Sequence, residues 1–155
     1  MNLLQRHFLY QNLFLVEEVL SEHQSVAECA VIGIKDQLKG QLPIGLIALK
    51  AGVTKENDEI SKECIQMVRD KVGPVAAFKI AIVVKRLPKT RSGKVLRGTI
   101  RKIADKEDYK MPATIDDPAI LTEITEELIK NKILKKWLYI GNRLKFENIS
   151  CNCEF

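Results

Sequence analysis

Two short apolar runs separated by a polar turn constrain the fold of this chain more than any other feature. Residues 27–34 and 42–49 are rich in β-branched and other apolar side chains, and the residues between them include Asp36 and Gly40. Short apolar runs bounded by turn residues are typical of buried strands, so an antiparallel pair of strands is predicted. Pro43 cannot donate a hydrogen bond to a neighbouring strand, and it therefore fits only the start or the edge of its strand.

Helical periodicity is clearest over residues 55–72, where apolar side chains recur every three or four positions. This spacing predicts an amphipathic helix with Thr54 as its N-cap, ended by Gly73 and Pro74. The apolar stripe consists of Ile60, Cys64, Met67, Val68 and Val72. An earlier helical pattern is predicted to end at Ser21, because a polar stretch begins there.

The rest of the chain adds one more strand and two more helices to this prediction. Residues 75–84 are a strand candidate, a helical pattern follows through Leu96 and Ile100, and a late helix is expected near residues 118–139. The order of elements predicts an α/β (α+β) fold, a small sheet of about three strands covered by helices. A length of 155 residues is that of one ordinary domain. Residues 142–155 lack periodicity and are expected to fray.

Charge and cysteine content restrict the partners and the compartment. The chain has 25 Lys and Arg against 20 Asp and Glu, a formal net charge of +5 that favours anionic partners such as phosphates or nucleotides. Cys29 and Cys64 lie in apolar segments, so a reducing, intracellular compartment is expected rather than a disulfide framework. Cys151 and Cys153 make only a weak zinc pattern. No apolar run reaches the roughly 20 residues of a membrane helix, so no membrane partner is expected.

Residues 88–94 read Pro-Lys-Thr-Arg-Ser-Gly-Lys and form a polar loop between a predicted strand and a predicted helix. Cations, hydroxyls and a glycine together suit the close approach of a phosphate or a carboxylate. This is not a Walker A loop, which needs glycine in place of Pro88 and serine or threonine in place of Val95. Lys94 is expected to open the next helix, where the helix dipole disfavours a cation. A functional role is therefore indicated, and a solvated basic loop is the alternative.

Residues 88–97 and three earlier blocks, residues 26–33, 36–41 and 68–74, occur in an order that carries a family resemblance. Together they resemble the adenylate-forming superfamily, specifically the AMP-forming acyl-CoA synthetases. The short-chain branch, which comprises the acetate and propionate enzymes, is the most similar, and the propionate type is slightly closer. The resemblance runs from about residue 17 to residue 125 and covers only the C-terminal domain of that family.

The resemblance implies a small, mobile domain that swings between one orientation for adenylation and another for thioester formation. Lys94 matches the family's catalytic lysine, which would bridge the carboxylate of the acid and the α-phosphate region of ATP. Arg69 matches an arginine that reaches the nucleotide end of CoA; the alternative is an exposed cation at a helix end. His23 matches a histidine near Mg²⁺; the alternative is a histidine satisfied by solvent or backbone. The residues expected to shape the loop are Lys89, Thr90, Arg91, Ser92 and Gly93.

The phosphate loop and hinge motif that precede this domain in the family are absent from the sequence. The chain is therefore divided into an atypical lead-in (residues 1–16), an AMP-binding enzyme C-terminal domain (residues 17–125) and an atypical helical and frayed tail (residues 126–155). ATP, CoA and Mg²⁺ are the cofactors expected of the complete enzyme, and an N-terminal adenylating domain and a small carboxylic acid are the expected partners. The isolated chain is expected to be inactive. The expected location is the mitochondrial matrix or the cytoplasm.

Two other functions are alternatives to this one. A polyanion-binding or nucleic-acid-binding module would use the positive charge, but only 6% of the residues are aromatic and the basic residues are dispersed, so no nucleic-acid partner is expected. A regulatory or interaction fragment would instead bind the N-terminal domain of the enzyme and compete with the complete protein. Binding to a separately expressed N-terminal domain would distinguish such a fragment from an inert one.

Overall fold

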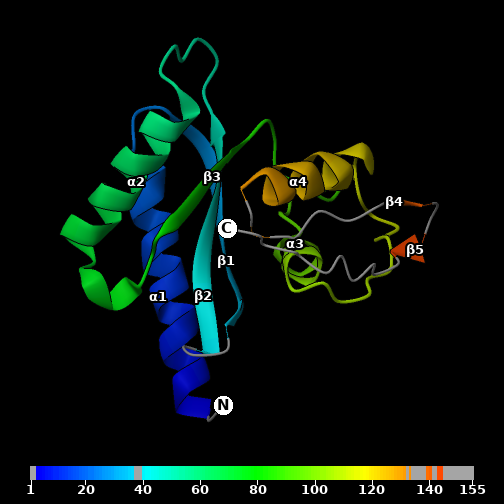
Figure 1. The fold of residues 1–155 in the computed structure, drawn as a ribbon, viewed down its shortest axis with the longest axis horizontal. Coiled ribbons are helices and arrows are strands. Elements are labelled where there is room, and N and C mark those ends of the chain that lie inside the picture. Colours follow the sequence, from blue (N-terminus) through cyan, green and yellow to red (C-terminus); the bar gives the residue numbers. More distant parts are fainter. Residues whose placement is uncertain (1–2, 37–39, 132, 134–138, 141–142, 145–155) are drawn as a thin grey trace, which may run out of the picture.

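A three-stranded sheet forms the centre of the molecule (Figure 1). The computed structural model describes residues 3–36, 40–131, 133, 139–140 and 143–144. The strands lie in the order β1 (Val26–Asp36), β2 (Gly40–Leu49) and β3 (Ile80–Val84). β1 and β2 pair antiparallel, as predicted, and β3 pairs parallel to β2. A parallel neighbour needs a long crossover connection, and the helix between β2 and β3 supplies it.

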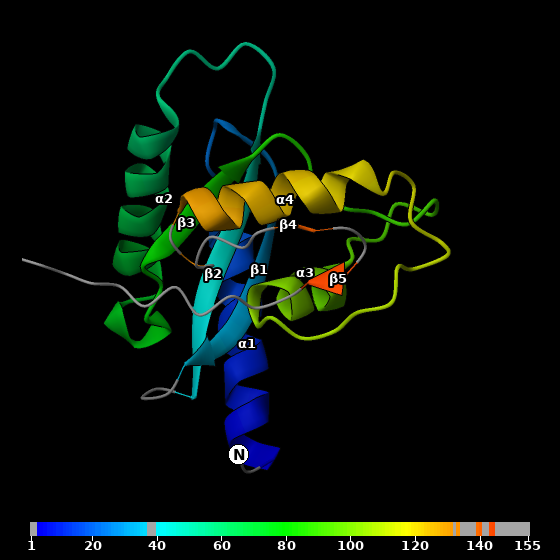
Figure 2. The same ribbon diagram turned by 45° about the vertical axis from the view of Figure 1, so that its right-hand side comes forward.

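Helices cover both faces of the sheet in the part of the chain that the structure describes (Figures 1 and 2). One face carries α1 (Leu3–Ser21) and α2 (Asn57–Lys71), and the other carries α3 (Arg97–Ala104) and α4 (Ala119–Lys130). The remaining elements are a 3₁₀ turn at Pro74–Ala76 and a small hairpin of β4 (Tyr139–Ile140) and β5 (Arg143–Leu144). The predicted α/β fold is confirmed, and helices cover both faces of the sheet.

The central strand β2 explains why its sequence is almost continuously apolar. Residues 44–48 are all buried, because β2 has a strand on each side and helices above and below. Ile44 and Leu46 join the apolar cluster beneath α3 and α4, whereas Ile47 joins the cluster beneath α1 and α2. Pro43 pairs with β1 only, since pairing with β3 starts one residue later. Pro43 is therefore inside β2 but at a position with a neighbouring strand on one side only, which is the edge position that was predicted as one of the two alternatives.

The start of α2 and the start of β3 differ from the prediction. α2 begins at Asn57 and has Glu56 in the N-cap position, so Thr54 is not its cap. The 3₁₀ turn at Pro74–Ala76 replaces the first part of the expected strand. Ala77 then has a positive φ of 50°, which a strand residue does not adopt, and β3 begins only at Ile80. Apolar side chains at positions 75–78 pointed to a strand, but Pro74 imposes a turn.

The last predicted helix is also shorter than expected. α4 ends at Lys130, and Tyr139 belongs to β4, so the helical assignment up to residue 139 was wrong. Arg143–Leu144 form a strand rather than a frayed end. The other residues of the segment 142–155, including Cys151 and Cys153, lie outside the described residues.

The predicted division of the chain places its boundaries inside two helices. α1 continues without a break across residue 16, and the fully buried Val16 belongs to the core. α4 likewise crosses residue 125 and contributes the fully buried Leu128. Part of the lead-in and part of the tail therefore pack with the central domain. None of the described helices is long and apolar enough to cross a membrane.

Candidate functional site

The loop between β3 and α3 folds into a tight hairpin whose tip, residues 91–94, ends at Lys94. The backbone N–H of Thr90 donates to the carbonyl of Lys94 (2.9 Å), and that of Gly93 donates to the carbonyl of Thr90 (2.8 Å). The backbone N–H of Lys94 also donates to Oγ1 of Thr90 (3.1 Å). Gly93 has a φ of +84°, which side chains of L-residues rarely permit. A three-residue hairpin loop closed by a residue in the left-handed region has this geometry.

The side chain of Lys94 is exposed and forms no ion pair or hydrogen bond within the described part of the chain. The guanidinium of Arg91, three residues earlier, is likewise exposed and unpaired among those residues. The tip of the hairpin therefore presents two cations that can meet an anion from outside the domain. Lys94 was expected to open the next helix, but it does not. α3 begins at Arg97, so the cation at the positive end of the helix dipole is that arginine.

The base of the hairpin contrasts with its tip, because it is packed and paired. Leu87 and Pro88 are buried. Lys89 Nζ lies 2.5 Å from Oε1 of Glu28 in β1, and Arg97 forms an ion pair with Glu17 in α1. These two acids were not among the predicted site residues. Glu28 stands in one of the sequence blocks that carried the family resemblance, but nothing in the sequence connects it to a lysine 61 positions away.

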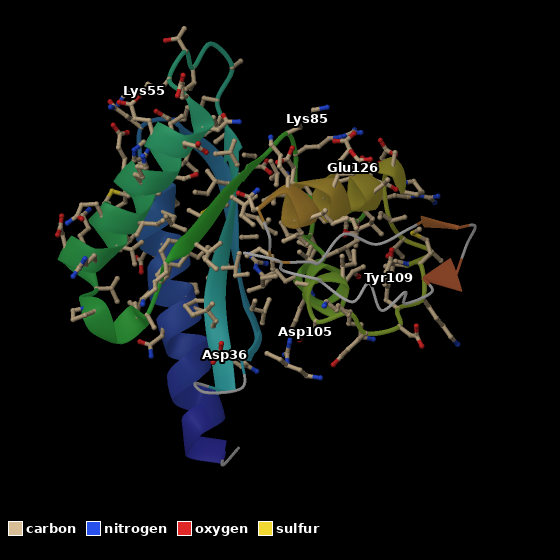
Figure 3. The ribbon with its side chains drawn as sticks, viewed as in Figure 1. Asp36, Lys55, Lys85, Asp105, Tyr109 and Glu126 are labelled. Carbon is tan, nitrogen blue, oxygen red and sulfur yellow. The ribbon has the colours of Figure 1, made fainter. Side chains whose placement is uncertain are left out.

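Sheet register explains why the hairpin meets β1. Val84, the last residue of β3, pairs with Ala48 of β2, which in turn pairs with Glu28 of β1. The chain leaves β3 at the end of the sheet where Glu28 lies, passes Lys85 (labelled in Figure 3) and crosses to the β1 edge. In Figure 2 the green hairpin runs beside the yellow segment that leads into α4. A bridge between Thr90 and Ile115 joins the two.

A hollow of about 450 Å³ lies between α1 and the hairpin. Its lining includes Phe14 and Glu17 of α1, Cys29 of β1, and Lys89 and Gly93 of the loop. Burial, followed by the nearby Glu17 carboxylate, raises the pKa of Cys29 to about 11. A thiol with this pKa stays protonated at neutral pH, so the hollow does not offer an activated cysteine nucleophile.

Arg69 is exposed in the last turn of α2 and forms no ion pair or side-chain hydrogen bond with the described residues. α2 ends close to the beginning of β3, whereas the Lys94 hairpin starts where β3 ends (Figure 1). The fold therefore places Arg69 and Lys94 toward opposite ends of the sheet. The two cations cannot share one small ligand held on this domain alone.

His23 lies between α1 and α2, and both of its ring nitrogens have partners. Nδ1 accepts a hydrogen bond from the backbone N–H of Ser25 (3.2 Å), and Nε2 lies 3.2 Å from Oε2 of Glu63. Lys55 Nζ, at 2.6 Å from the other carboxylate oxygen, holds the pKa of Glu63 below its ordinary value, and the hydrogen bond from His23 adds to this effect. His23 follows α1 and Glu63 belongs to α2, so their contact joins the turn after α1 to α2. The described residues include no group of three or more His, Cys, Asp or Glu that could hold a metal ion.

Comparison with known proteins decides the family of this chain. The sequence profile of the AMP-binding enzyme C-terminal domain matches residues 15–94. The chain belongs to this family. An uncharacterized protein of Pseudomonas aeruginosa is 55% identical over 115 residues, which are 73% of this chain and 18% of that protein. The mitochondrial acyl-CoA synthetase short-chain family member B of Dictyostelium discoideum is 48% identical over 118 residues, 76% of this chain and 17% of that protein.

A solved structure supports the same assignment. The acyl-CoA synthetase of Brucella canis is similar with a TM-score of 0.54 and 31% identity, over 58% of this chain and 16% of that one. This AMP-binding enzyme C-terminal domain thus spans less than a fifth of the length of these relatives. The predicted membership of the adenylate-forming superfamily is confirmed. The roles assigned to Lys94, Arg69 and His23 remain predictions.

Proposed function

We propose that this chain supplies the lysine-bearing C-terminal domain of an AMP-forming ligase that joins a short-chain carboxylic acid, acetate or propionate, to CoA. The observation that carries the proposal is the exposed, unpaired ammonium of Lys94 at the tip of a hairpin whose base is fixed. Membership of the AMP-binding enzyme C-terminal domain family and the short-chain relative of Dictyostelium support it.

In the first step, the carboxylate of the acid attacks the α-phosphorus of ATP, and the bond to the leaving pyrophosphate breaks. Lys94 would lie between the two reactants, which both carry negative charge. Its ammonium would offset their repulsion and hold the attacking oxygen in line, and it would stabilise the charge that builds up on the α-phosphate. A lysine suits this position because its single charge lies at the end of a long, flexible stem.

In the second step, the thiol of CoA attacks the acyl carbonyl and releases its proton to solvent, a carbon–sulfur bond forms, and the bond to the phosphate oxygen of the leaving AMP breaks. Arg69 would bind phosphate at the nucleotide end of CoA, for which its guanidinium is free. The separation of Arg69 from Lys94 suits a domain that presents different surfaces in the two steps. His23 was assigned to Mg²⁺, but that ion prefers oxygen ligands and both ring nitrogens already have partners. We therefore derive no step through Mg²⁺ on this chain.

The proposed partner is an N-terminal adenylating domain, because the relatives extend far beyond the part that this chain matches, which is 18% and 17% of their length. We propose that the chain alone does not ligate acids. The name of the Dictyostelium relative favours the mitochondrial matrix as the location, with the cytoplasm as the alternative.

The proposal is tested by mixing the chain with the separately expressed N-terminal domain of the Dictyostelium relative. ATP–pyrophosphate exchange that depends on acetate or propionate is expected only in the mixture, and Lys94→Ala is expected to lower it by about 10²- to 10³-fold. Acyl-CoA formed by the chain alone, above a Lys94→Ala control, would refute the proposed dependence on a partner.

Pull-down of the same two proteins tests the regulatory alternative. Phe14 of α1 is 70% exposed and lines the hollow beside the hairpin, so α1 offers an apolar contact on the side of Lys94. Binding without any exchange activity would favour a fragment that only competes for the N-terminal domain. Binding together with exchange that requires Lys94 would support the catalytic proposal.

A further inference from the structure

Two ion pairs connect the Lys94 hairpin to α1 and β1, one on each side of its tip. Before the tip, Lys89 Nζ contacts Glu28 Oε1 at 2.5 Å. After the tip, Arg97 contacts both carboxylate oxygens of Glu17 through Nη2 and Nε, the latter at 3.3 Å. Both acids belong to elements that precede the loop by more than 60 positions. The two ion pairs that attach the loop to α1 and β1 therefore both join residues that are far apart in the sequence.

Glu17 is held by β1 as well as by the arginine. Its Oε2 accepts a hydrogen bond from the backbone N–H of Val31 (3.0 Å), so one carboxylate connects α1, β1 and the start of α3. Arg97 is the first residue of α3, where the helix dipole opposes a positive charge. The carboxylate of Glu17 offsets this unfavourable interaction. An arginine that would otherwise turn toward solvent is kept against the body of the domain.

The hairpin is well connected within itself and to the segment that follows α3. Leu96 N–H donates to the carbonyl of Pro88 (2.9 Å), Arg91 N–H to that of Thr114 (3.0 Å) and Asp116 N–H to that of Lys89 (3.0 Å). These backbone bonds give the hairpin its shape. They leave its orientation toward α1 and β1 to the two ion pairs, which among the described residues are the hydrogen-bonded contacts between those elements and the loop.

The geometry points to Glu17 and Glu28 as positioning residues that fix the direction in which Lys94 leaves the domain. Exposed ion pairs contribute little to global stability, and the side chains of these two pairs are between 24% and 44% exposed. Their effect falls on the orientation of a local element, which needs far less free energy to disturb than the fold. By neutralising Lys89 and Arg97 they also leave Arg91 and Lys94 as the unpaired cations of the hairpin. An anion is thereby directed to the tip.

Amide hydrogen exchange of the 155-residue chain tests the positioning role without any enzymatic activity. Glu28→Gln and Glu17→Gln remove one charge each and keep the shape of the side chain. Each is expected to speed the exchange of the Thr90, Gly93 and Lys94 amides by about fivefold, while amides of β2 stay unchanged. Glu22→Gln is the matched control, because Glu22 pairs with Lys71 away from the loop.

The outcomes of this experiment are separable. Unchanged exchange in the hairpin of the Glu17→Gln, Glu28→Gln double variant would overturn the inference. Equal acceleration in the hairpin and in β2 would also overturn it, since the two acids would then stabilise the whole fold rather than orient the loop. An unchanged Tm together with faster exchange in the hairpin alone would support it.

A kinetic experiment connects positioning to the reaction, and this part rests on the proposed function. In the mixture with the N-terminal domain, Glu28→Gln is expected to lower kcat for adenylation about tenfold with little change in KM for ATP, because substrate binding sites are untouched. The exchanged pair Glu28→Lys with Lys89→Glu is expected to recover most of that loss, and Glu28→Lys alone is not. Failure of the rescue would contradict the role of the pair.

The two proposals fail in different ways. If Lys94→Ala leaves adenylation unchanged, the proposed function of Lys94 is wrong, but the exchange experiment still decides whether Glu17 and Glu28 orient the hairpin. Suppose instead that the Glu17 and Glu28 variants leave amide hydrogen exchange in the hairpin unchanged, while Lys94→Ala strongly lowers adenylation. Lys94 then acts as proposed, and the positioning inference is wrong.

Discussion

The cations at the base of the hairpin are paired with carboxylates, whereas those at its tip are not. At the base, Lys89 and Arg97 are each paired with a glutamate from another element. At the tip, Arg91 and Lys94 have no partner among the described residues. All four are surface cations in the same stretch of sequence, so composition does not separate them. The domain therefore fixes the base of the hairpin through ion pairs and leaves the cations of the tip available to another molecule.

The largest expected effect comes from removing the charge at the tip. Lys94→Ala is expected to lower the rate of acyl-adenylate formation in the mixture with an N-terminal domain by about 10²- to 10³-fold, since it removes electrostatic stabilisation of the transition state. Its far-UV circular dichroism and Tm are expected to match the unsubstituted chain, because the side chain has no described partner. A loss of less than threefold would contradict the distinction between tip and base.

Removing the charge at the base is expected to have a smaller effect. Lys89→Ala breaks the pair with Glu28 but leaves Lys94 in place, so adenylation is expected to fall only about tenfold. The ratio of the two losses, measured in the same ATP–pyrophosphate exchange assay, gives the size of the difference between catalysis and positioning. Equal losses from Lys89→Ala and Lys94→Ala would mean that both cations act on the substrate directly.

Replacing either of two glycines with alanine is expected to change Tm, with opposite signs in the hairpin and in α3. Gly93 has a φ of +84° and open space around the position of a Cβ, so Gly93→Ala adds backbone strain without a clash. A strain of about 1 kcal/mol is expected to lower Tm by about 2–4 °C. Gly98 lies in α3 with equally open space, so Gly98→Ala is expected to raise Tm, because alanine favours helices. Calorimetry showing shifts of the same sign would contradict the hairpin geometry at Gly93.

The smallest expected effect is a change in the alkylation rate of Cys29 when the nearby carboxylate of Glu17 is removed. The pKa of Cys29 is about 11, so its alkylation by iodoacetamide is expected to accelerate about tenfold per pH unit between pH 8 and 10 as the thiolate forms. Glu17→Gln removes a charge that raises this pKa and frees Arg97, which lowers it. The rate at pH 9 is therefore expected to rise, by less than tenfold.

Cys64 is the internal control for this measurement. Its pKa is also raised to about 11, by burial and by Glu63, but Glu17 has no part in that shift. Peptide mass spectrometry can follow both cysteines in one sample. Slower alkylation of Cys29 in Glu17→Gln, or equal changes at both cysteines, would contradict the proximity of Glu17 and Arg97 to Cys29.

The sequence predicted most of the fold because the fold follows from local patterns. The apolar runs of β1 and β2, the stripe of α2 and the stop at Gly73 each depend on residues that are close in sequence. The predicted bounds were wrong at two elements, the start of β3 and the end of the last helix. Pro74 turned the expected beginning of β3 into a 3₁₀ turn, and the last helical pattern was followed too far, up to Tyr139.

For the candidate site, the sequence identified the loop and its cations but assigned them no partners. Lys94 was expected at the first turn of a helix, whereas the hairpin ends before α3 and places Arg97 there. Glu28 was visible as part of a sequence block, and Glu17 as a helix residue, but neither had a predicted role. Their pairs span 61 and 80 positions, and no local rule predicts which of several exposed acids meets a given cation.

By itself, the sequence determined that three strands and their helices form one α/β domain, because periodicity and turn residues act over a few positions. Its resemblance to the adenylate-forming superfamily came separately, from four blocks of sequence. Only the tertiary structure decided which cations of the loop are paired and which stay free. The parallel addition of β3 to β2 brings the end of β3 level with Glu28, so the chain that follows crosses to the β1 edge, where it meets Glu28 of β1 and Glu17 of α1. The partners of the hairpin are thus a consequence of strand order and register, which no stretch of the loop encodes alone.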